Sequence, residues 1–196
     1  MKKKIAITGG IGSGKSVAAR YLADLGYPVF SCDEIYKEII ASPAYIEKIE
    51  HRFPKAVKNK RIDRKALAQA VFNSKENLQF LNSVSHPLIM ECLLKKMEKV
   101  NSDLVFAEVP LLFEGDFENL FDKVLVLLRD EEKRKKDLVL RDNLSEKEID
   151  SRMQSQFCYT SNEGRLRLKN CNACVIENNG NLHDLKNKID QFLTVT

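Results

Sequence analysis

Eight consecutive residues near the start of the sequence, Gly9-Gly-Ile-Gly-Ser-Gly-Lys-Ser16, have the residue types and spacing of a phosphate-binding loop. They match the pattern G-x-x-x-x-G-K-(S/T) without a mismatch. The four glycines allow backbone dihedral angles that are closed to other residues, so a row of N–H donors comes close to phosphate oxygens. We expect Lys15 to contact the outer phosphates and Ser16 to be a hydroxyl ligand of Mg²⁺. The expected contacts of the nucleoside triphosphate are Gly10, Ile11, Gly12, Ser13, Gly14, Lys15 and Ser16.

The motif lies between the two elements that it requires. An apolar run over 4–8 predicts a strand before it, and apolar residues at helical spacing over 16–25 predict a helix after it, closed by Gly26. The start of that helix adds a partial positive charge directed at the bound anion. Pattern and context together therefore favour a nucleotide site over a purely structural glycine turn.

Further apolar runs predict the sheet that carries the loop. The runs over 103–107 and 123–128 are continuous, as expected for parallel strands covered on both faces, and shorter runs occupy 27–30 and 173–176. Residues 33–100 read as nearly all helical, with Asp63 and Ser74 as helix caps and Pro87 in the first turn of a further helix. Strands alternating with helices indicate an α/β fold, a doubly wound parallel sheet with helices on both faces.

These elements suggest one domain with insertions. We expect a core formed by 1–32, 101–129 and 169–196, a helical substrate-binding insertion at about 33–100 and a helical lid at about 130–168. The lid region is basic, since residues 133–169 hold ten Lys or Arg and six Asp or Glu. It is either a solvated helix face or a cationic flap that closes over polyphosphate.

Composition restricts the class of protein. The chain has 196 residues, 43% hydrophobic and 31% charged, with a net charge of +4, which excludes a disordered or low-complexity chain. No apolar run has the length of a membrane span and the N-terminus does not resemble a signal peptide, so we expect a cytoplasmic protein. Five cysteines fit a reducing compartment. Cys171 and Cys174 lack the further ligands of a zinc site, and we interpret them as structural.

The phosphate loop leaves the acceptor open among small-molecule kinases, GTPase or ATPase switches and motor-like proteins. A GTPase needs a base-specifying Asn-Lys-x-Asp segment in a loop, whereas the segment at 187–190 lies in an amphipathic helical pattern over 182–193. A helicase-like ATPase would be larger and would interleave basic with aromatic residues for base stacking. Size and layout therefore favour a small kinase that acts on no nucleic acid and no membrane.

Within that class the sequence resembles the dephospho-coenzyme A kinase family over most of its length. The residues that carry the resemblance are the loop from Thr8 to Ser16, Asp33, Leu81-Asn82 with His86-Pro87, Val109-Pro-Leu-Leu-Phe-Glu114, Arg141-Asp142, Arg152-Met-Gln-Ser-Gln156 and Asn178-Asn-Gly180. The Pro-Leu-Leu-Phe-Glu segment and the His-Pro pair are its specific markers. The resemblance implies transfer of the γ-phosphoryl group of ATP to the ribose 3′-hydroxyl of dephospho-coenzyme A, the last step of coenzyme A synthesis.

The resemblance also implies roles for individual residues. Asp33 at a strand end is the expected general base, with a Mg²⁺ or water ligand as the alternative. Glu108, at the end of another strand, is expected to hold Mg²⁺ through water, or else is a plain strand-end charge. Arg141 corresponds to a flap arginine for phosphate oxygens, with an ion pair to Asp137 as the alternative. Asn178 and Gly180 are expected beside the adenine, and Lys37 and His86 beside the acceptor. His86 is interpreted as a helix-capping or substrate-domain residue rather than a proton carrier.

The sequence departs from the family pattern at several of these places. Ser31 precedes Asp33 where the family often has an acidic residue, and Lys37 and Asp137 stand where arginines are expected. Arg134 or Lys133, in the preceding turn, is a candidate for the missing charge. Two other functions stay open, a kinase for another hydroxylated small molecule such as a nucleoside or nucleotide, and a non-enzymatic protein gated by nucleotide. The sequence does not specify the oligomeric state.

Overall fold

The computed structural model describes residues 2–72, 74–142 and 145–196, without the side chains of Arg141 and Asp142. It divides into two compact units, which are described separately. The first comprises Met1–Phe30 and Val100–Thr196, and the second comprises Ser31–Lys99.

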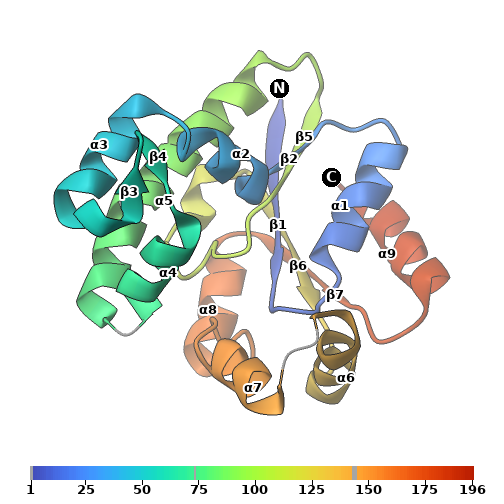
Figure 1. Cartoon of the computed structure of the whole chain (residues 1–196). Coiled ribbons are helices and arrows are strands. Elements are labelled where there is room, and N and C mark those ends of the chain that lie inside the picture. The colour runs from blue at the N-terminus through green and yellow to red at the C-terminus, as the bar shows by residue number, and fades with distance from the viewer. Residues whose placement is uncertain (1, 73, 143–144) are drawn as a thin grey trace. The chain divides into compact units, whose positions relative to one another are not determined.

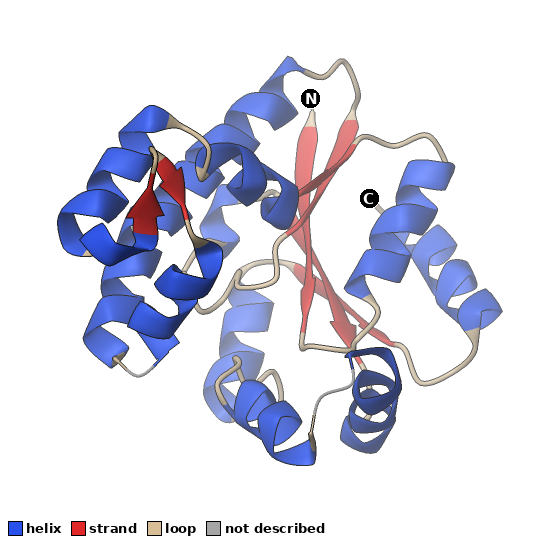
Figure 2. Cartoon of the chain, viewed as in Figure 1, coloured by secondary structure: helices blue, strands red, loops and turns tan. Residues whose placement is uncertain are grey.

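A five-stranded sheet forms the centre of the first unit (Figures 1 and 2). Its strands are β1 (Lys3–Gly9), β2 (Val29–Ser31), β5 (Leu104–Glu108), β6 (Lys123–Leu128) and β7 (Ala173–Glu177), in the spatial order β2-β5-β1-β6-β7. Strand β1 pairs in parallel with β5 and with β6, and β6 pairs in parallel with β7. The prediction of an α/β fold built on a parallel sheet is confirmed.

Helices α1 (Lys15–Asp24) and α9 (Leu182–Thr194) cover one face of this sheet (Figure 1). Ala18 and Leu22 of α1 and Ile189 of α9 pack with Ile5 and Leu127 in one buried cluster. Burial of such side chains contributes about 1.5–3 kcal/mol each for the larger aliphatic ones. This packing fixes the start of α1 relative to the end of β1, the place where the phosphate loop lies. The remaining helices of the unit are η2 (Glu118–Leu120), α6 (Glu131–Asp142), α7 (Glu146–Gln154) and α8 (Asn162–Asn170).

The second unit is mainly helical. Its elements are α2 (Cys32–Ile39), α3 (Pro43–Arg52), η1 (Pro54–Ala56), β3 (Val57–Lys58), β4 (Arg61–Ile62), α4 (Arg64–Phe72) and α5 (Lys75–Lys99). Tyr45, Ile49 and Phe53 of the α3 region form its own core with Leu67 of α4. The hydroxyl of Tyr45 is 2.7 Å from the hydroxyl of Ser85, and both side chains are buried. The unit therefore has a hydrophobic core independent of the sheet.

Two predicted caps in this unit are confirmed, and one predicted helix start is wrong. Asp63 accepts hydrogen bonds from the N–H groups of Lys65 and Ala66, and Ser74 accepts one from Asn77. Pro87 lies inside α5 and does not begin a helix. A proline inside a helix removes one backbone hydrogen bond, but buried residues on both sides of Pro87 keep α5 continuous.

The hairpin β3–β4 was not expected from the sequence, in which this region reads as nearly all helical. Asn59 and Lys60 connect its strands with φ angles of 52° and 57°. Two successive residues in the left-handed region form the kind of tight turn that joins antiparallel strands. Within the described ranges, no helix combines the length and the apolar character needed to cross a bilayer.

Candidate nucleotide-binding site

The phosphate loop joins β1 to α1 with strongly constrained backbone geometry. Gly9, Gly12 and Gly14 have φ angles of 144°, 75° and 100°, values that L side chains rarely adopt. Gly14 occupies the N-cap position of α1. Gly10 has no positive φ, so the expectation that all four glycines serve the backbone dihedrals is wrong for this one. A Cβ atom at Gly10 would stand 2.5 Å from Nη1 of Arg134, so its absence makes room for that side chain.

Lys15 is held against the loop that it follows. Its ammonium donates hydrogen bonds to the carbonyl oxygens of Gly9 at 2.8 Å and Gly10 at 2.9 Å. The positive charge of Lys15 thus lies beside the loop at the start of α1, where the helix dipole also favours an anion. This arrangement suits a charge that is to act on phosphate groups.

Ser16 and Glu108 lie together next to this loop. The Ser16 hydroxyl donates to Oε1 of Glu108 at 2.8 Å, and the register of β1 with β5 pairs Ile7 with Glu108. A hydroxyl and a carboxylate are hard oxygen ligands, and Mg²⁺ is typically bound by one or two protein oxygens with its remaining positions filled by water and phosphate. The pair therefore fits a magnesium ion, although no cluster of three or more His, Cys, Asp or Glu side chains is found among the described residues.

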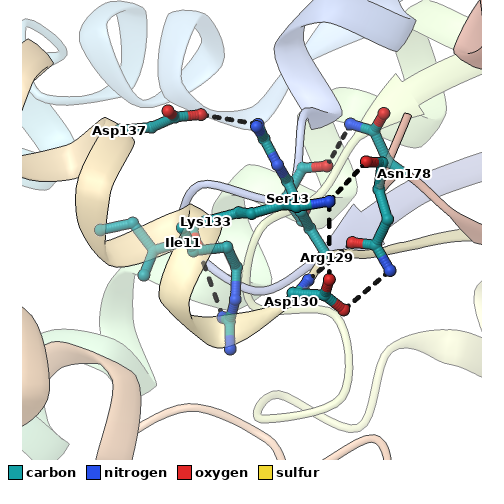
Figure 3. Close-up of polar contacts among 9 residues, drawn as sticks. Ile11, Ser13, Arg129, Asp130, Lys133, Asp137 and Asn178 are labelled. Atoms are coloured by element: carbon teal, nitrogen blue, oxygen red, sulfur yellow. Dashed lines mark hydrogen bonds and ion pairs between the residues drawn. The ribbon is translucent and has the colours of Figure 1, made fainter. Parts of the chain in front are cut away.

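Asn178, the residue that follows β7, supports the loop (Figure 3). Its side-chain N–H donates to the carbonyl oxygen of Ser13 at 2.9 Å, and its backbone N–H donates to Leu128 at 2.7 Å. The Asn178 side chain is 9% exposed, and a Cβ atom at Gly14 would stand 2.4 Å from its Nδ2. The structure thus places Asn178 against the phosphate loop.

Gly180 lies next to the start of α9. Asn181 is the N-cap of that helix and forms a reciprocal capping box with Asp184. A Cβ atom at Gly180 would stand 2.3 Å from Oδ2 of Asp184. The local structure therefore accounts for a glycine at this position through the cap.

Charged side chains at the start of α6 are arranged in pairs (Figure 3). Arg129 forms an ion pair with Asp137 at 2.7 Å. Lys133 donates to the carbonyl oxygen of Asn179 at 2.7 Å and lies 3.7 Å from Asp130. Arg141 is a residue of α6, but its side chain lies outside the described residues, and so does any pair it forms with Asp137.

The segment after α7 contacts the phosphate loop through a side chain to which the sequence assigned no role. Oε1 of Gln156 accepts the N–H of Ile11 at 2.8 Å. The next residue, Phe157, donates its N–H to Oε1 of Glu114 at 2.9 Å and stacks on Phe113 with a centroid separation of 4.5 Å. Glu114 is the last residue of the Pro-Leu-Leu-Phe-Glu segment. That motif drew attention to this part of the chain, but it did not predict the contact between Glu114 and Phe157.

These elements enclose a cavity of about 510 Å³ beside the loop. Among its lining residues are Gly10, Ser13, Arg134, Gln156, Cys158 and Tyr159. Burial raises the pKa of Tyr159 to about 12. Hydrogen bonds from Thr160 and Ser161 hold the pKa of the exposed Cys158 thiol below its usual value. A cavity lined by the loop and by a cationic side chain suits an anionic ligand.

The residues expected to contact the acceptor belong to the second unit. Asp33 lies in the first turn of α2, two residues after the end of β2, and is exposed. Lys37 follows one turn later and is also exposed. His86 is partly buried inside α5, so the interpretation of His86 as a helix-capping residue is wrong. The sequence reading placed His86 at a helix start because prolines are common in the first turn of a helix. It did not show that one long helix continues through Pro87.

Comparison with known proteins yields consistent matches across nearly the whole chain. The family model described as dephospho-CoA kinase matches residues 3–184. A dephospho-CoA kinase of Fusobacterium nucleatum is 37% identical over 190 residues, covering 96% of this chain and 95% of its own. The crystal structure of TT1252 from Thermus thermophilus has a TM-score of 0.82 at 34% identity, covering 98% of this chain and 97% of that one. A dephospho-CoA kinase structure from Campylobacter jejuni has a TM-score of 0.63 at 26% identity, with coverage of 98% and 96%.

Proposed function

The chain belongs to the dephospho-CoA kinase family, and we propose that it transfers the γ-phosphoryl group of ATP to the ribose 3′-hydroxyl of dephospho-coenzyme A, which completes coenzyme A. The observation that carries this proposal is the extent of the family match. Residues 3–184 include both the phosphate loop of the first unit and all of the second unit. The match therefore concerns the acceptor side of the reaction as well as the nucleotide side, which many kinases share.

The first unit is proposed to bind and orient ATP. Backbone N–H groups of the loop from Gly10 to Ser16 donate to phosphate oxygens, and the Lys15 ammonium leaves its carbonyl partners to do the same. Ser16 and Glu108, which are hydrogen-bonded to each other, would hold Mg²⁺, with Glu108 acting through water. Neutralisation of phosphate charge is the chemistry that this ion supplies when bound. Asn178 supports the loop, and Asn178 and Gly180 are proposed to lie beside the adenine.

The second unit is proposed to bind dephospho-coenzyme A. In this assignment Asp33 accepts the proton of the attacking 3′-hydroxyl, and Lys37 and His86 contact the substrate. Asp33 is an exposed carboxylate in the first turn of α2, as a base that meets a bound substrate requires. Catalysis then consists mainly of positioning and electrostatic stabilisation, as in other phosphoryl transfers.

Residues at about 130–168 are proposed to act as a lid, with Arg141 binding phosphate oxygens and closure excluding water from the reaction. We propose that the reaction takes place in the cytoplasm, a location supported by the five free cysteines, because a reducing compartment keeps thiols unpaired.

The proposed reaction is tested by measuring ADP release from ATP and Mg²⁺ with and without dephospho-coenzyme A, with the product mass determined in the same sample. We expect release to depend on the acceptor and one phosphate to be added to it for each ADP formed. ATP binding without phosphorylation of this acceptor would contradict the proposal. A panel of nucleosides, nucleotides and shikimate-like acids would then test the alternative acceptors.

Two variants with matched controls separate the proposed roles. Lys15→Ala should abolish transfer, whereas Arg20→Ala, an exposed cation on the same helix, should not. Asp33→Asn should retain ATP binding and lose turnover, whereas Glu34→Gln, the neighbouring exposed carboxylate of α2, should retain both. Near-normal turnover of Asp33→Asn would show that Asp33 is not the base.

A further inference from the structure

We propose that Arg134 binds the phosphate chain of the nucleotide and supplies the positive charge that the family resemblance placed at position 137. This inference rests on the proposed function, because it assumes that the loop binds a nucleoside triphosphate. It assigns to a residue of α6 a role that the sequence left open between Arg134 and Lys133.

The first observation is a partly buried cation that lacks an anionic partner. Arg134 Nε is buried and has no hydrogen-bond partner, and Nη1 reaches only the carbonyl oxygen of Ile11, at 3.5 Å. Burial lowers the pKa of this guanidinium, and the charge of Glu131 opposes that effect only in part. No carboxylate of the described residues forms an ion pair with it. Removing part of a charged group from water without a partner is costly, so this guanidinium is suited to an anionic partner that binds there.

The neighbouring charges are already paired. Lys133 is bound to the backbone of Asn179, and Arg129 is paired with Asp137. Lys135 lies 2.9 Å from Glu131 and 2.7 Å from Asp150. Lys133 is directed at the segment after β7, and the charge of Arg129 is neutralised by Asp137. Neither of these two cations therefore acts on the loop. Arg134 is the residue of this turn that does.

The loop itself is shaped to accept this arginine. Gly10 has an ordinary backbone φ, yet a Cβ atom there would stand 2.5 Å from Nη1 of Arg134. A Cβ atom at Gly12 would stand 3.2 Å from Cβ of Arg134. Gly10 thus lets the guanidinium lie against the loop, and Gly12 lets α6 approach it. Two glycines of the motif therefore accommodate one side chain.

The position and chemistry of the guanidinium agree on the ligand. Arg134 lines the cavity that also contains Gly10 and Ser13 of the loop. A guanidinium offers several N–H donors in a planar fork that matches the oxygens of a phosphate group, and it keeps its charge even when partly buried. A phosphate oxygen would provide both the acceptor and the negative charge that Arg134 lacks in the ligand-free protein.

The test is direct binding of ATP, ADP and adenosine to the wild-type protein, Arg134→Ala and Arg134→Lys, by calorimetry in the absence of acceptor. Loss of a hydrogen bond to a charged group should weaken ATP binding about 10- to 150-fold in Arg134→Ala. Arg134→Lys should fall between the two. Adenosine affinity should change less than about twofold, since it has no phosphate, and Lys136→Ala, an exposed cation on the same helix, should match the wild type.

A double-mutant cycle tests the geometry. Gly10→Ala should weaken ATP binding in the wild type, and should add little to Arg134→Ala because the clashing guanidinium is then gone. Unchanged ATP affinity in Arg134→Ala, or an equal loss for adenosine, would overturn the inference. These outcomes are distinct from failure of the proposed function, which would appear as absent ATP binding in the wild type or as ATP binding without transfer to dephospho-coenzyme A.

Discussion

Replacing Asn178 tests whether this residue supports the phosphate loop in the absence of any ligand. Asn178→Ala removes the donor that satisfies the Ser13 carbonyl at 2.9 Å and leaves that oxygen beside a small void in a buried site. The backbone hydrogen bond from Asn178 to Leu128 is unaffected. The variant therefore isolates one side-chain hydrogen bond.

The expected cost follows from this geometry. Leaving a buried acceptor without a partner destabilises a protein by about 1–3 kcal/mol. At about 2–4 °C for each kcal/mol in a chain of this length, the midpoint of thermal unfolding should fall by about 2–12 °C. Asn178→Asp should cost at least as much, because it places a carboxylate oxygen against the Ser13 carbonyl. The affinity for ATP should fall in both variants, since the loop is less well ordered before binding.

Thermal unfolding of the ligand-free protein, followed by circular dichroism, measures this effect. Asn179→Ala is the control, because its hydrogen bonds with Asp130 are more exposed to water and their loss should cost less than about 1 kcal/mol. If Asn178→Ala lowered nucleotide affinity but left the unfolding midpoint of the ligand-free protein unchanged, Asn178 would be a ligand contact and the supporting role would be refuted.

Two further predictions concern a thiol of the nucleotide-binding unit and the core of the second unit. Cys158 should be alkylated before the other cysteines at neutral pH, because it is exposed and its lowered pKa increases the thiolate fraction. Burial raises the pKa of Cys171 and Cys174, so these thiols should react more slowly. Peptide mass mapping over time measures the rates, and equal rates for Cys158 and Cys174 would contradict the prediction. Ser85→Ala should destabilise the chain by about 1 kcal/mol or more by removing the partner of the buried Tyr45 hydroxyl, and Ser85→Ala with Tyr45→Phe should recover part of that loss. Thermal unfolding measures both variants, and ATP affinity, which depends on the first unit, should remain unchanged.

The sequence predicts the sheet and the loop because their signals are local. The strand over 123–128 coincides with β6, and the motif from Gly9 to Ser16 specifies a loop between a strand and a helix. Continuous apolar runs and a motif with fixed spacing need no tertiary information. The continuity of α5 through Pro87 could not be predicted in this way, because it depends on buried contacts on both sides of the proline.

The same distinction applies to the site. Lys15 and Ser16 are identified by their place in a motif, whereas Gln156 and Arg134 reach the loop from residues more than a hundred positions away. Their contacts depend on how α6 and the segment after α7 pack, which no spacing rule encodes. The need for glycine at position 10 could not be predicted either, because it also depends on the packing of α6. This glycine serves a side chain of α6 and not its own dihedral angles.

The hydrogen bond between Gln156 and the N–H of Ile11 means that the phosphate loop already carries an internal ligand. An anion that takes this donor does not simply replace water. It competes with a tethered amide that is always present at high local concentration, so its apparent affinity reports an exchange. An acceptor displaces the Gln156 amide only if it forms a stronger hydrogen bond with the Ile11 N–H, and a charged oxygen does so more readily than a neutral one. The loop thereby discriminates against weak, uncharged acceptors before any catalytic residue is involved.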